Sequence, residues 1–355
     1  MRRINIEDIS DGDILGQAIS AQNGAVLMYE GVELKPYHIK KLKDNHITHI
    51  FVKDPAPDKV VESFTIDEIA RESVDEVKCI IEKRFRTENN EEIRQIAEVA
   101  SSIISEVITN PDISNCVINV KRNSDSIYSH LLNVATLSTI IGIKIGMGQE
   151  QILDVARGAI LHDIGLCSVD EKYIDVDMDH MPAAEKLNYR KHVITGYESI
   201  KNIDWLRDTV KDIVLLHHER NDGSGYPFHK KEGSLPIEVK LVAACDHFDE
   251  LTNGIAYKKN KVSDVVEYFR TKGMHLFDHE IVNTLLTNIA WFPTDSKVVT
   301  NEGDIAVVFK QNKALPDRPV LRIIENKEGR KFDSELVVKD LTEDLTCFIV
   351  DILEE

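Results

Sequence analysis

The chain contains 355 residues with a formal net charge of -18, and 42% of its residues are hydrophobic. This length predicts two or three domains, and the composition is ordinary for a globular protein with a substantial core. The negative charge argues against long nucleic acid and anionic membrane surfaces as partners, because both bind clustered Lys and Arg. A small anionic substrate would need bound divalent metal ions to reverse the charge locally.

Residues 1–54 are predicted to form a small mixed α/β module. Short apolar runs typical of strands occur at Gln17–Ile19, Ala25–Met28 and His49–Val52. Turns are indicated at Asn23-Gly24 and Glu30-Gly31, and one short helix is predicted at Tyr37–Asn45. Residues 55–100 are interpreted as a linker and helical connector that begins with Pro55-Ala-Pro57.

Residues 101–292 are predicted to form an all-α domain. Apolar residues recur at helical spacing from the end of the connector onward, over Ile93–Val107, Leu131–Ile141 and Ile152–Ile160. The same reasoning predicts later helices at Ile213–His218, Val239–Leu251, Val262–Arg270 and His279–Asn288. A bundle of this size can enclose a site.

Residues 293–355 are predicted to form a small all-β domain, either a barrel or a sandwich. Its strand-like runs are Ile305–Phe309, Val320–Ile324, Leu336–Val338 and Phe348–Ile352, with turns at Asn301–Gly303 and Lys327–Gly329. The segment has no cluster of catalytic residue types, so a structural or protein-binding role is expected.

Several features predict a soluble cytoplasmic protein. No apolar segment follows Arg2 and Arg3, and no run approaches the roughly 20 apolar residues of a membrane span. The five cysteines are widely spaced without a CxxC pair, which is typical of reduced thiols.

The helical region places imidazoles and carboxylates inside apolar sequence. Burying such groups is costly unless they are paired or bound to metal. Taken singly, each is better explained as a core histidine or a helix-end carboxylate. Taken together they predict one shared metal site, formed by His130, His162, Asp163, His192, His217, His218 and Asp246.

A mixed nitrogen and oxygen ligand set suits Fe, Mn or Zn. The adjacent His162 and Asp163 can serve two ions, with Asp163 bridging them. Two such ions activate a bridging water and clamp a phosphate during in-line attack. The residue types therefore point to hydrolysis of a phosphate ester.

Two motifs resemble those of a known family. His162-Asp163-Ile164-Gly165 resembles the HD motif of the HD phosphohydrolase superfamily, and residues 217–227, HHERNDGSGYP, resemble the HD-GYP signature. The similarity covers about residues 124–257 and implies an HD-type helical domain that hydrolyses a cyclic dinucleotide, with cyclic di-GMP the first candidate. A metal-bridging hydroxide would open the ring to a linear dinucleotide, which a second cut would convert to GMP.

The resemblance also implies residue roles. One ion would be held by His130, His162, Asp163 and Asp246, and the other by Asp163, His192, His217 and His218. Of these, His162 and Asp163 are the predicted catalytic pair. Ser126 stands where some family members add a third metal through Glu, so two divalent ions are predicted, iron first and manganese next.

Substrate contacts are expected from the signature loop and one nearby cation. Glycine permits unusual backbone angles, proline stiffens the turn, and tyrosine offers a stacking face and a hydroxyl. The alternative is that the loop only closes the bundle. The predicted contacts are Arg220, Asp222, Gly225, Tyr226, Pro227 and Lys258.

The sequence departs from the family pattern at two positions. Leu166 stands where Lys is common, and Ile255 stands where Arg is frequent. Each change removes a cation from near an anionic substrate, which Lys258 would offset in part. The remaining histidines, His247 among them, are interpreted as surface or helix-end residues.

Two alternatives to this enzyme remain. A cyclic-dinucleotide sensor or scaffold could keep every metal ligand and lose catalysis, and an HD phosphohydrolase could act on another phosphate ester. A homodimer, and protein partners of the terminal domains, are left open by the sequence.

Overall fold

A computed structural model describes most of the chain after residue 90. It describes residues 91–109, 118–119, 127–168, 177–178, 180–332 and 337–353. Before these it describes residues 2–5, 19–20, 26–28, 34, 42–43, 47, 49–52, 64–65, 75–81 and 83. The chain divides into two compact units, Met1–Val60 and Val61–Glu355.

The first unit contains two small antiparallel pairs of strands. Strand β1 (Arg2–Asn5) pairs with β4 (His49–Val52), and β2 (Ile19–Ser20) pairs with β3 (Val26–Met28). Residues 42–43 are helical, inside the helix predicted at Tyr37–Asn45. The predicted turns at Asn23-Gly24 and Glu30-Gly31, and the linker that begins at Pro55, lie outside the described residues.

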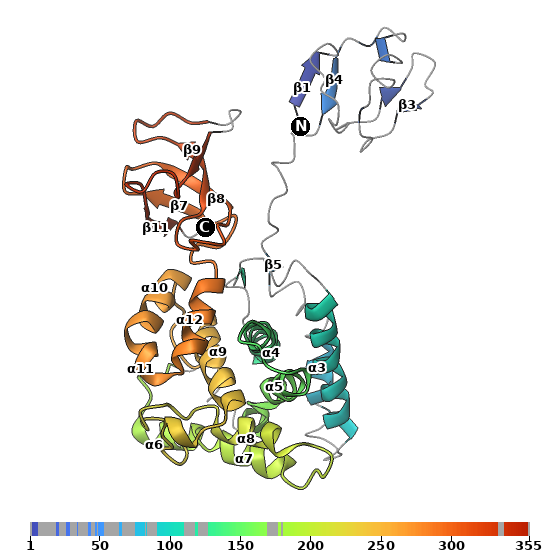
Figure 1. The fold of residues 1–355 in the computed structure, drawn as a ribbon, viewed down its shortest axis with the longest axis vertical. Helices are drawn as coiled ribbons and strands as arrows, with labels where there is room; N and C mark the ends of the chain where they lie inside the picture. The colour runs from blue at the N-terminus through green and yellow to red at the C-terminus, as the bar shows by residue number, and fades with distance from the viewer. Residues whose placement is uncertain are drawn as a thin grey trace. The chain divides into compact units, whose positions relative to one another are not determined.

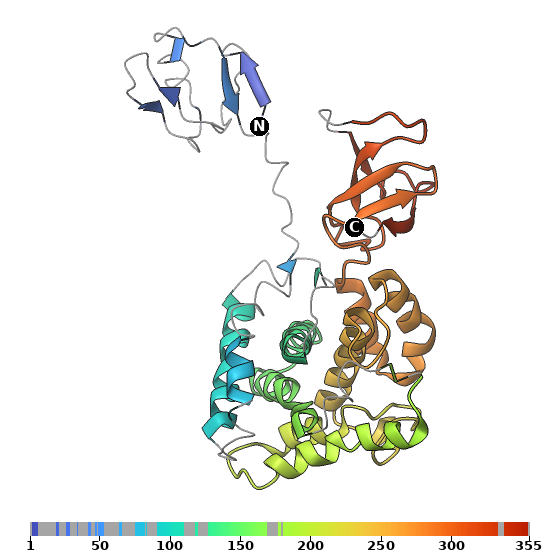
Figure 2. The same cartoon turned by 180° about the vertical axis from the view of Figure 1, so that it is seen from behind.

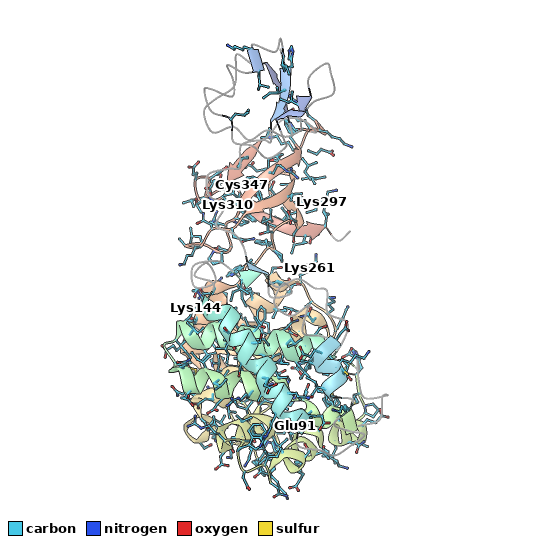
Figure 3. All side chains as sticks on the ribbon, turned by 90° about the vertical axis from the view of Figure 1, so that its right-hand side faces the viewer. Glu91, Lys144, Lys261, Lys297, Lys310 and Cys347 are labelled. Atoms are coloured by element: carbon cyan, nitrogen blue, oxygen red, sulfur yellow. The ribbon has the colours of Figure 1, made fainter. Side chains whose placement is uncertain are left out.

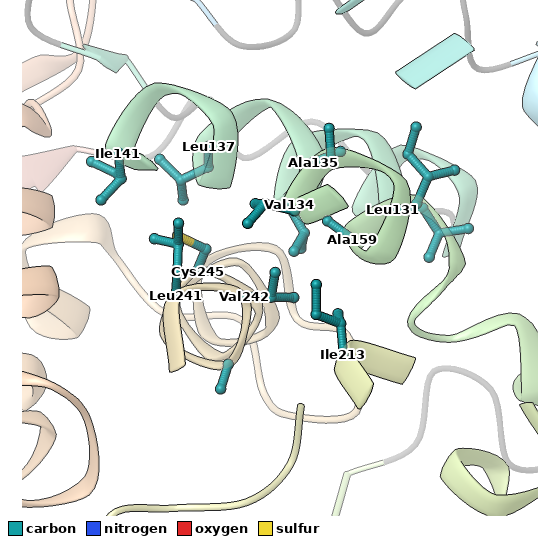
Figure 4. Packing of buried hydrophobic residues seen from close by; sticks show 14 of the residues in the cluster. Leu131, Val134, Ala135, Leu137, Ile141, Ala159, Ile213, Leu241, Val242 and Cys245 are labelled. Atoms are coloured by element: carbon teal, nitrogen blue, oxygen red, sulfur yellow. The ribbon is translucent and has the colours of Figure 1, made fainter. Parts of the chain in front are cut away.

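The helical part of the second unit is built around α4 (Ile127–Lys144), α5 (Gln149–Leu161) and α9 (Ile237–Asn253), which pack against one another (Figure 1). Helix α3 (Glu91–Thr109) covers α4 and α5. Most of α4 is buried, as expected for a helix that is apolar nearly all round. Figure 4 shows Leu131 and Val134 of α4 facing the same core as Ile213 and Val242.

Shorter helices complete this part, and both faces can be followed in Figures 1 and 2. The 3₁₀ turn η1 (Ile164–Ser168) follows α5 and lies against α7 (His192–Ile200). The other helical elements are α6 (Ala183–Tyr189), α8 (Asp208–Leu216), η3 (Glu232–Ser234), α10 (Val262–Tyr268), η4 (Phe269–Gly273), α11 (Met274–Leu276) and α12 (His279–Asn288). Two short strands, β5 (Phe64–Thr65) and β6 (Ile118–Asn119), pair in parallel.

Two glycines allow close approach between helices. A Cβ added at Gly165 would lie 2.0 Å from the backbone oxygen of His192, so any side chain there would push η1 away from α7. A Cβ at Gly158 of α5 would lie 2.5 Å from the Ile213 side chain of α8. Gly165 therefore sets the distance between η1 and α7, and Gly158 sets the distance between α5 and α8.

The C-terminal part is one five-stranded antiparallel sheet in the order β10-β9-β8-β7-β11. Its strands are β7 (Lys297–Thr300), β8 (Ile305–Lys310), β9 (Val320–Glu325), β10 (Val338–Asp340) and β11 (Ile349–Leu353). Alternate residues such as Ala306, Val308 and Leu321 are buried in its own apolar core. Figure 3 labels Lys297 on β7 and Lys310 on β8.

The predicted all-α and all-β parts are confirmed. The described strands form a single sheet, whereas a sandwich would need two. Strand β7 was not predicted, and Leu336 of the predicted third run lies outside the described residues. Within the described residues, no helix has the length and apolar character needed to cross a membrane.

Replacing Gly165 with Ala tests the contact between η1 and α7. The new methyl group meets backbone that cannot rotate away, so the free energy of unfolding should fall by about 1–3 kcal/mol. Urea denaturation measures this loss. Gly233→Ala is the control, because a Cβ there meets no atom within 4 Å. Equal stability of the two variants would contradict the tight approach.

Candidate metal centre

Five helices or helix ends supply the predicted ligands. His130 lies in α4, His162 and Asp163 follow the end of α5, and Asp246 lies in α9. His192 begins α7, while His217 and His218 follow the end of α8. All are buried, and the side chains of His130, His162, His192 and His217 are fully inaccessible to solvent. The structure thus brings together every residue that was predicted to bind metal.

The Nδ1 atom of each fully buried histidine is held by an acceptor. His130 Nδ1 lies 2.8 Å from Oδ2 of Asp249. The Nδ1 atoms of His162 and His192 lie 2.6 Å and 3.0 Å from the carbonyl oxygens of Ala159 and Tyr189. His217 Nδ1 faces the carbonyls of Ile213 and Val214. Because these groups only accept, Nδ1 carries a proton in each ring, and Nε2 is the nitrogen left to bind a cation or a second proton.

These Nε2 atoms converge in pairs. His130 Nε2 lies 3.2 Å from His162 Nε2, and His192 Nε2 lies 3.4 Å from His217 Nε2. Two nitrogens bound to one ion at about 2.0–2.1 Å would stand roughly 3 Å apart. Facing lone pairs repel unless a proton or a metal ion lies between them, so the pairing fits two cations.

Asp163 spans the two histidine pairs with its two oxygens. Oδ2 lies 3.8 Å from His130 Nε2 and 3.4 Å from His162 Nε2. Oδ1 lies 3.1 Å from His192 Nε2 and 3.5 Å from His217 Nε2. One oxygen for each pair is the arrangement of a carboxylate that bridges two ions.

Asp246 also spans the centre. Its Oδ1 lies 3.1 Å from His130 Nε2 and 3.3 Å from His162 Nε2, and its Oδ2 lies 3.9 Å from His218 Nδ1. Asp163, His192, His217 and His218 offer ligand atoms that all lie within 4.8 Å of one another, as do those of His130, His162 and Asp163. The two sets share Asp163.

The carboxylate oxygens support the fit to a metal. Oδ1 of Asp163 and both oxygens of Asp246 are buried and accept no hydrogen bond from any described residue. Uncompensated buried anions are costly, and a divalent cation among them would remove that cost. The mixed imidazole and carboxylate donors suit Fe, Mn or Zn.

The imidazoles and carboxylates of the centre shift one another's pKa values. Burial alone would lower the pKa of His162, but Asp163 and Asp246 raise it to about 10. Burial alone would raise the pKa of Asp163, but the neighbouring imidazoles hold it well below its usual range. In metal-free protein a proton on His162 would therefore balance part of the negative charge of these carboxylates.

The signature loop closes over the second histidine set. A Cβ at Gly225 would lie 2.4 Å from the carbonyl oxygen of His218, so only glycine fits there. The next residue, Tyr226, stacks on the His218 ring at 4.7 Å and 23°, and Pro227 follows it in the turn. The guanidinium of Arg190 lies 4.9 Å above the same tyrosine ring.

The other predicted substrate contacts lie in different settings. Arg220 is nearly buried, donates to the carbonyls of His217 and Glu219, and lies over the Phe277 ring. These contacts to backbone carbonyls indicate that Arg220 stabilises the conformation of the signature loop, residues 217–227. Asp222 is exposed and accepts from the Ser224 amide, while Lys258 is exposed.

Several residues of the centre were not assigned from sequence. Asp249 orients His130, and its other oxygen accepts from Asn253. Glu250 is buried beside Asp246, and burial raises its pKa well above the usual range. His247, interpreted as a surface or helix-end residue, is buried and contacts Glu250, so that interpretation was wrong. Ser126, the position of the third-metal ligand, lies outside the described residues.

The positions that lack the expected cations are packed with apolar side chains. Leu166 and Ile255 belong to one buried cluster with Ile127, Tyr189 and Ala256. Tyr189 also contacts the His192 ring at 5.2 Å, so this cluster lies beside the centre. The region is buried and hydrophobic where the family pattern has positive charge.

The second unit is a helical domain with a buried cluster of histidines and aspartates that could hold metal, followed by a small β domain. Residues 112–281 match the family model of the HD domain, and residues 298–355 match a KOW domain associated with the HD domain. The helical segment is therefore an HD domain, and the resemblance carried by its motifs is confirmed.

The chain is similar to two curated cyclic di-GMP phosphodiesterases. It is 22% identical over 61% of its length to one from Pseudomonas aeruginosa, and 25% identical over 58% to PdeB from Borreliella burgdorferi. It spans 52% and 53% of those proteins' own lengths. The solved structure of Bd1817, a HDG"Y"P protein from Bdellovibrio bacteriovorus, shares the fold. Its TM-score is 0.52 at 18% identity, covering 80% of this chain and 98% of that chain.

Replacing Asp249 with Asn tests the orientation of His130. The amide can no longer stabilise a protonated Nδ1 as an anion does, so metal affinity should fall about 10- to 100-fold. Metal titration followed by elemental analysis measures this change. Asp154→Asn is the control, because Asp154 is equally buried but pairs with Arg207 outside the centre. Unchanged affinity in the Asp249 variant would rule out this role.

Removing metal with a chelator should destabilise the protein. A metal ion held by the folded centre would have no comparable site in the unfolded chain, where the ligands are dispersed. A thousandfold excess of metal over Kd would then contribute about 4 kcal/mol to the free energy of unfolding. Calorimetry should show a lower midpoint of unfolding after chelation and its recovery after Mn(II) is added back. An identical midpoint in both states would contradict metal binding at the buried residues.

Proposed function

We propose that this protein is a metal-dependent phosphodiesterase that hydrolyses a cyclic dinucleotide, with cyclic di-GMP as the first candidate. The observation that carries the proposal is the bridging position of Asp163, whose two oxygens face two separate histidine pairs. Two divalent ions held there would activate water and stabilise the charge of a phosphodiester undergoing in-line displacement. The cyclic di-GMP phosphodiesterase names of the two relatives support the substrate class.

The chain's own residues have separate tasks in this proposal. His130, His162 and Asp246 would hold one ion, His192, His217 and His218 would hold the other, and Asp163 would contribute one oxygen to each. The Nδ1 contacts of the buried histidines keep Nε2 free of protons and aimed at the ions. Tyr226, stacked on His218, supplies an aromatic face beside the ions at which a nucleotide base or ribose can rest.

A second candidate function is a sensor that binds cyclic dinucleotide without cleaving it. One observation favours this alternative: Leu166 and Ile255 fill the expected cation positions with buried apolar side chains. Without those charges a phosphodiester would be held less firmly in its transition state. The complete set of converging ligands favours the enzyme.

Hydrolysis of cyclic di-GMP by anaerobically purified protein loaded with Fe(II) or Mn(II) tests the proposal. Chromatography should show linear dinucleotide or GMP, with activity reduced by at least about 10³-fold in Asp163→Asn, because the shared bridge is lost. His279→Ala is the control, since His279 is exposed on α12.

The other outcomes separate the alternatives. Protein that binds two metal ions and cyclic di-GMP but releases no product is the sensor. Cleavage of a mononucleotide or an aryl phosphodiester in preference to every cyclic dinucleotide would indicate a phosphohydrolase of different specificity.

A further inference from the structure

An exposed arginine stands at the rim of the metal centre. Arg190 immediately follows α6 and lies two residues before His192, the first residue of α7. Its guanidinium lies 4.9 Å above the ring of Tyr226, and that ring stacks on His218. A single aromatic ring therefore connects the Arg190 charge to a predicted metal ligand.

The charge of Arg190 is not consumed by a carboxylate. Among the described residues, none offers a carboxylate oxygen within ion-pair distance of its guanidinium. Stacking on an aromatic face leaves the edge of a guanidinium, with its N–H groups, open for a planar or tetrahedral anion. The guanidinium of Arg190 thus lies over the Tyr226 ring, and its N–H groups make no ion pair with any described residue.

Neighbouring cations are less well placed. Arg220 is nearly buried and donates hydrogen bonds to the carbonyls of His217 and Glu219. Lys191 donates to the side chain of Asn188. Lys230 lies over the exposed ring of Phe228, beyond the signature loop.

The site lacks cations at two positions, Leu166 and Ile255, where the family pattern has them. Leu166 and Ile255 pack in an apolar cluster that also contains Tyr189, the residue immediately before Arg190. The chain carries a net charge of -18, so an incoming phosphate meets overall repulsion unless positive charge is concentrated at the site. Arg190 is the cation that the described structure places next to both the apolar cluster and Tyr226.

We propose that Arg190 binds a phosphate group of the substrate and supplies the positive charge that is absent at Leu166 and Ile255. That the phosphate belongs to a cyclic dinucleotide rests on the proposed function. That Arg190 recognises a phosphate group does not. Tyr226 is the platform that holds the guanidinium face while the N–H edge meets the phosphate oxygens. Arginine suits this task because it binds phosphate in a bidentate manner.

Titration of Mn(II)-loaded protein with GMP measures phosphate recognition without turnover. Arg190→Gln should raise the Kd for GMP about tenfold or more, because a charged hydrogen bond is lost. Arg190→Lys should recover part of the affinity, since lysine keeps the charge but not the two-pronged contact. Lys191→Gln, a matched loss of charge on the next residue, should stay within about twofold of wild type.

Mn content and the midpoint of thermal unfolding accompany each titration. Both should be unchanged in Arg190→Gln. Loss of metal there would overturn the proposal, because Arg190 would then act through Tyr226 and His218 and not on the phosphate. Equal Kd values for wild type and Arg190→Gln, or equal losses in the Arg190 and Lys191 variants, would overturn it as well.

The KM for cyclic di-GMP distinguishes this inference from the proposed function. If wild type hydrolyses cyclic di-GMP, Arg190→Gln should raise KM by a factor similar to that for GMP. If wild type does not hydrolyse any cyclic dinucleotide, the proposed function fails, and the GMP titration still decides whether Arg190 recognises phosphate.

Discussion

Unprotonated imidazole nitrogens do not rest a little over 3 Å apart unless something positive lies between them. At this centre two such pairs face each other across one carboxylate, and each of the four paired histidines has its Nδ1 held by an acceptor. Neither pair can relax by turning a ring without leaving a carbonyl or Asp249 unpaired. The helices are therefore arranged so that these imidazoles and carboxylates converge, and the apolar packing maintains that arrangement.

The positions of the ligands follow from where helices end. His162, His192 and His217 stand at helix boundaries, where the chain turns and the side chain can point inward without competing with a neighbouring turn. His130 and Asp246 lie within helices buried on most sides, which carry them into the same interior. Close contacts at Gly165 and Gly158 set the spacing between these helices.

Periodicity and motif spacing predicted much of this arrangement. The helix predicted at His279–Asn288 begins and ends where α12 does, and the turn at Gly303 has the positive φ of 90° for which glycine is suited. The convergence of the seven predicted ligands was predictable because imidazoles and carboxylates occur inside apolar runs of the sequence. Strand β7 was missed because Lys297–Thr300 is short and polar at both ends.

Other features depend on contacts that a single sequence does not display. The bond from His130 to Asp249 joins residues 119 apart, and the direction of Asp249 is decided only when α4 and α9 pack. His247 looked like a surface residue because it is polar, yet α9 is buried around most of its circumference. Arg190 belongs to no recognised motif, and its place at the rim depends on Tyr226 meeting it from another segment.

The order of strands in the C-terminal sheet has a consequence for how that part of the protein can be handled. β7, where the chain enters the sheet, pairs directly with β11, where the chain leaves it, and all ladder partners lie between Lys297 and Leu353. Among the residues that the structure describes, the strand ladder is thus complete within one stretch of chain. Such a segment can be excised, permuted or exchanged between proteins as one cassette without cutting a strand pair.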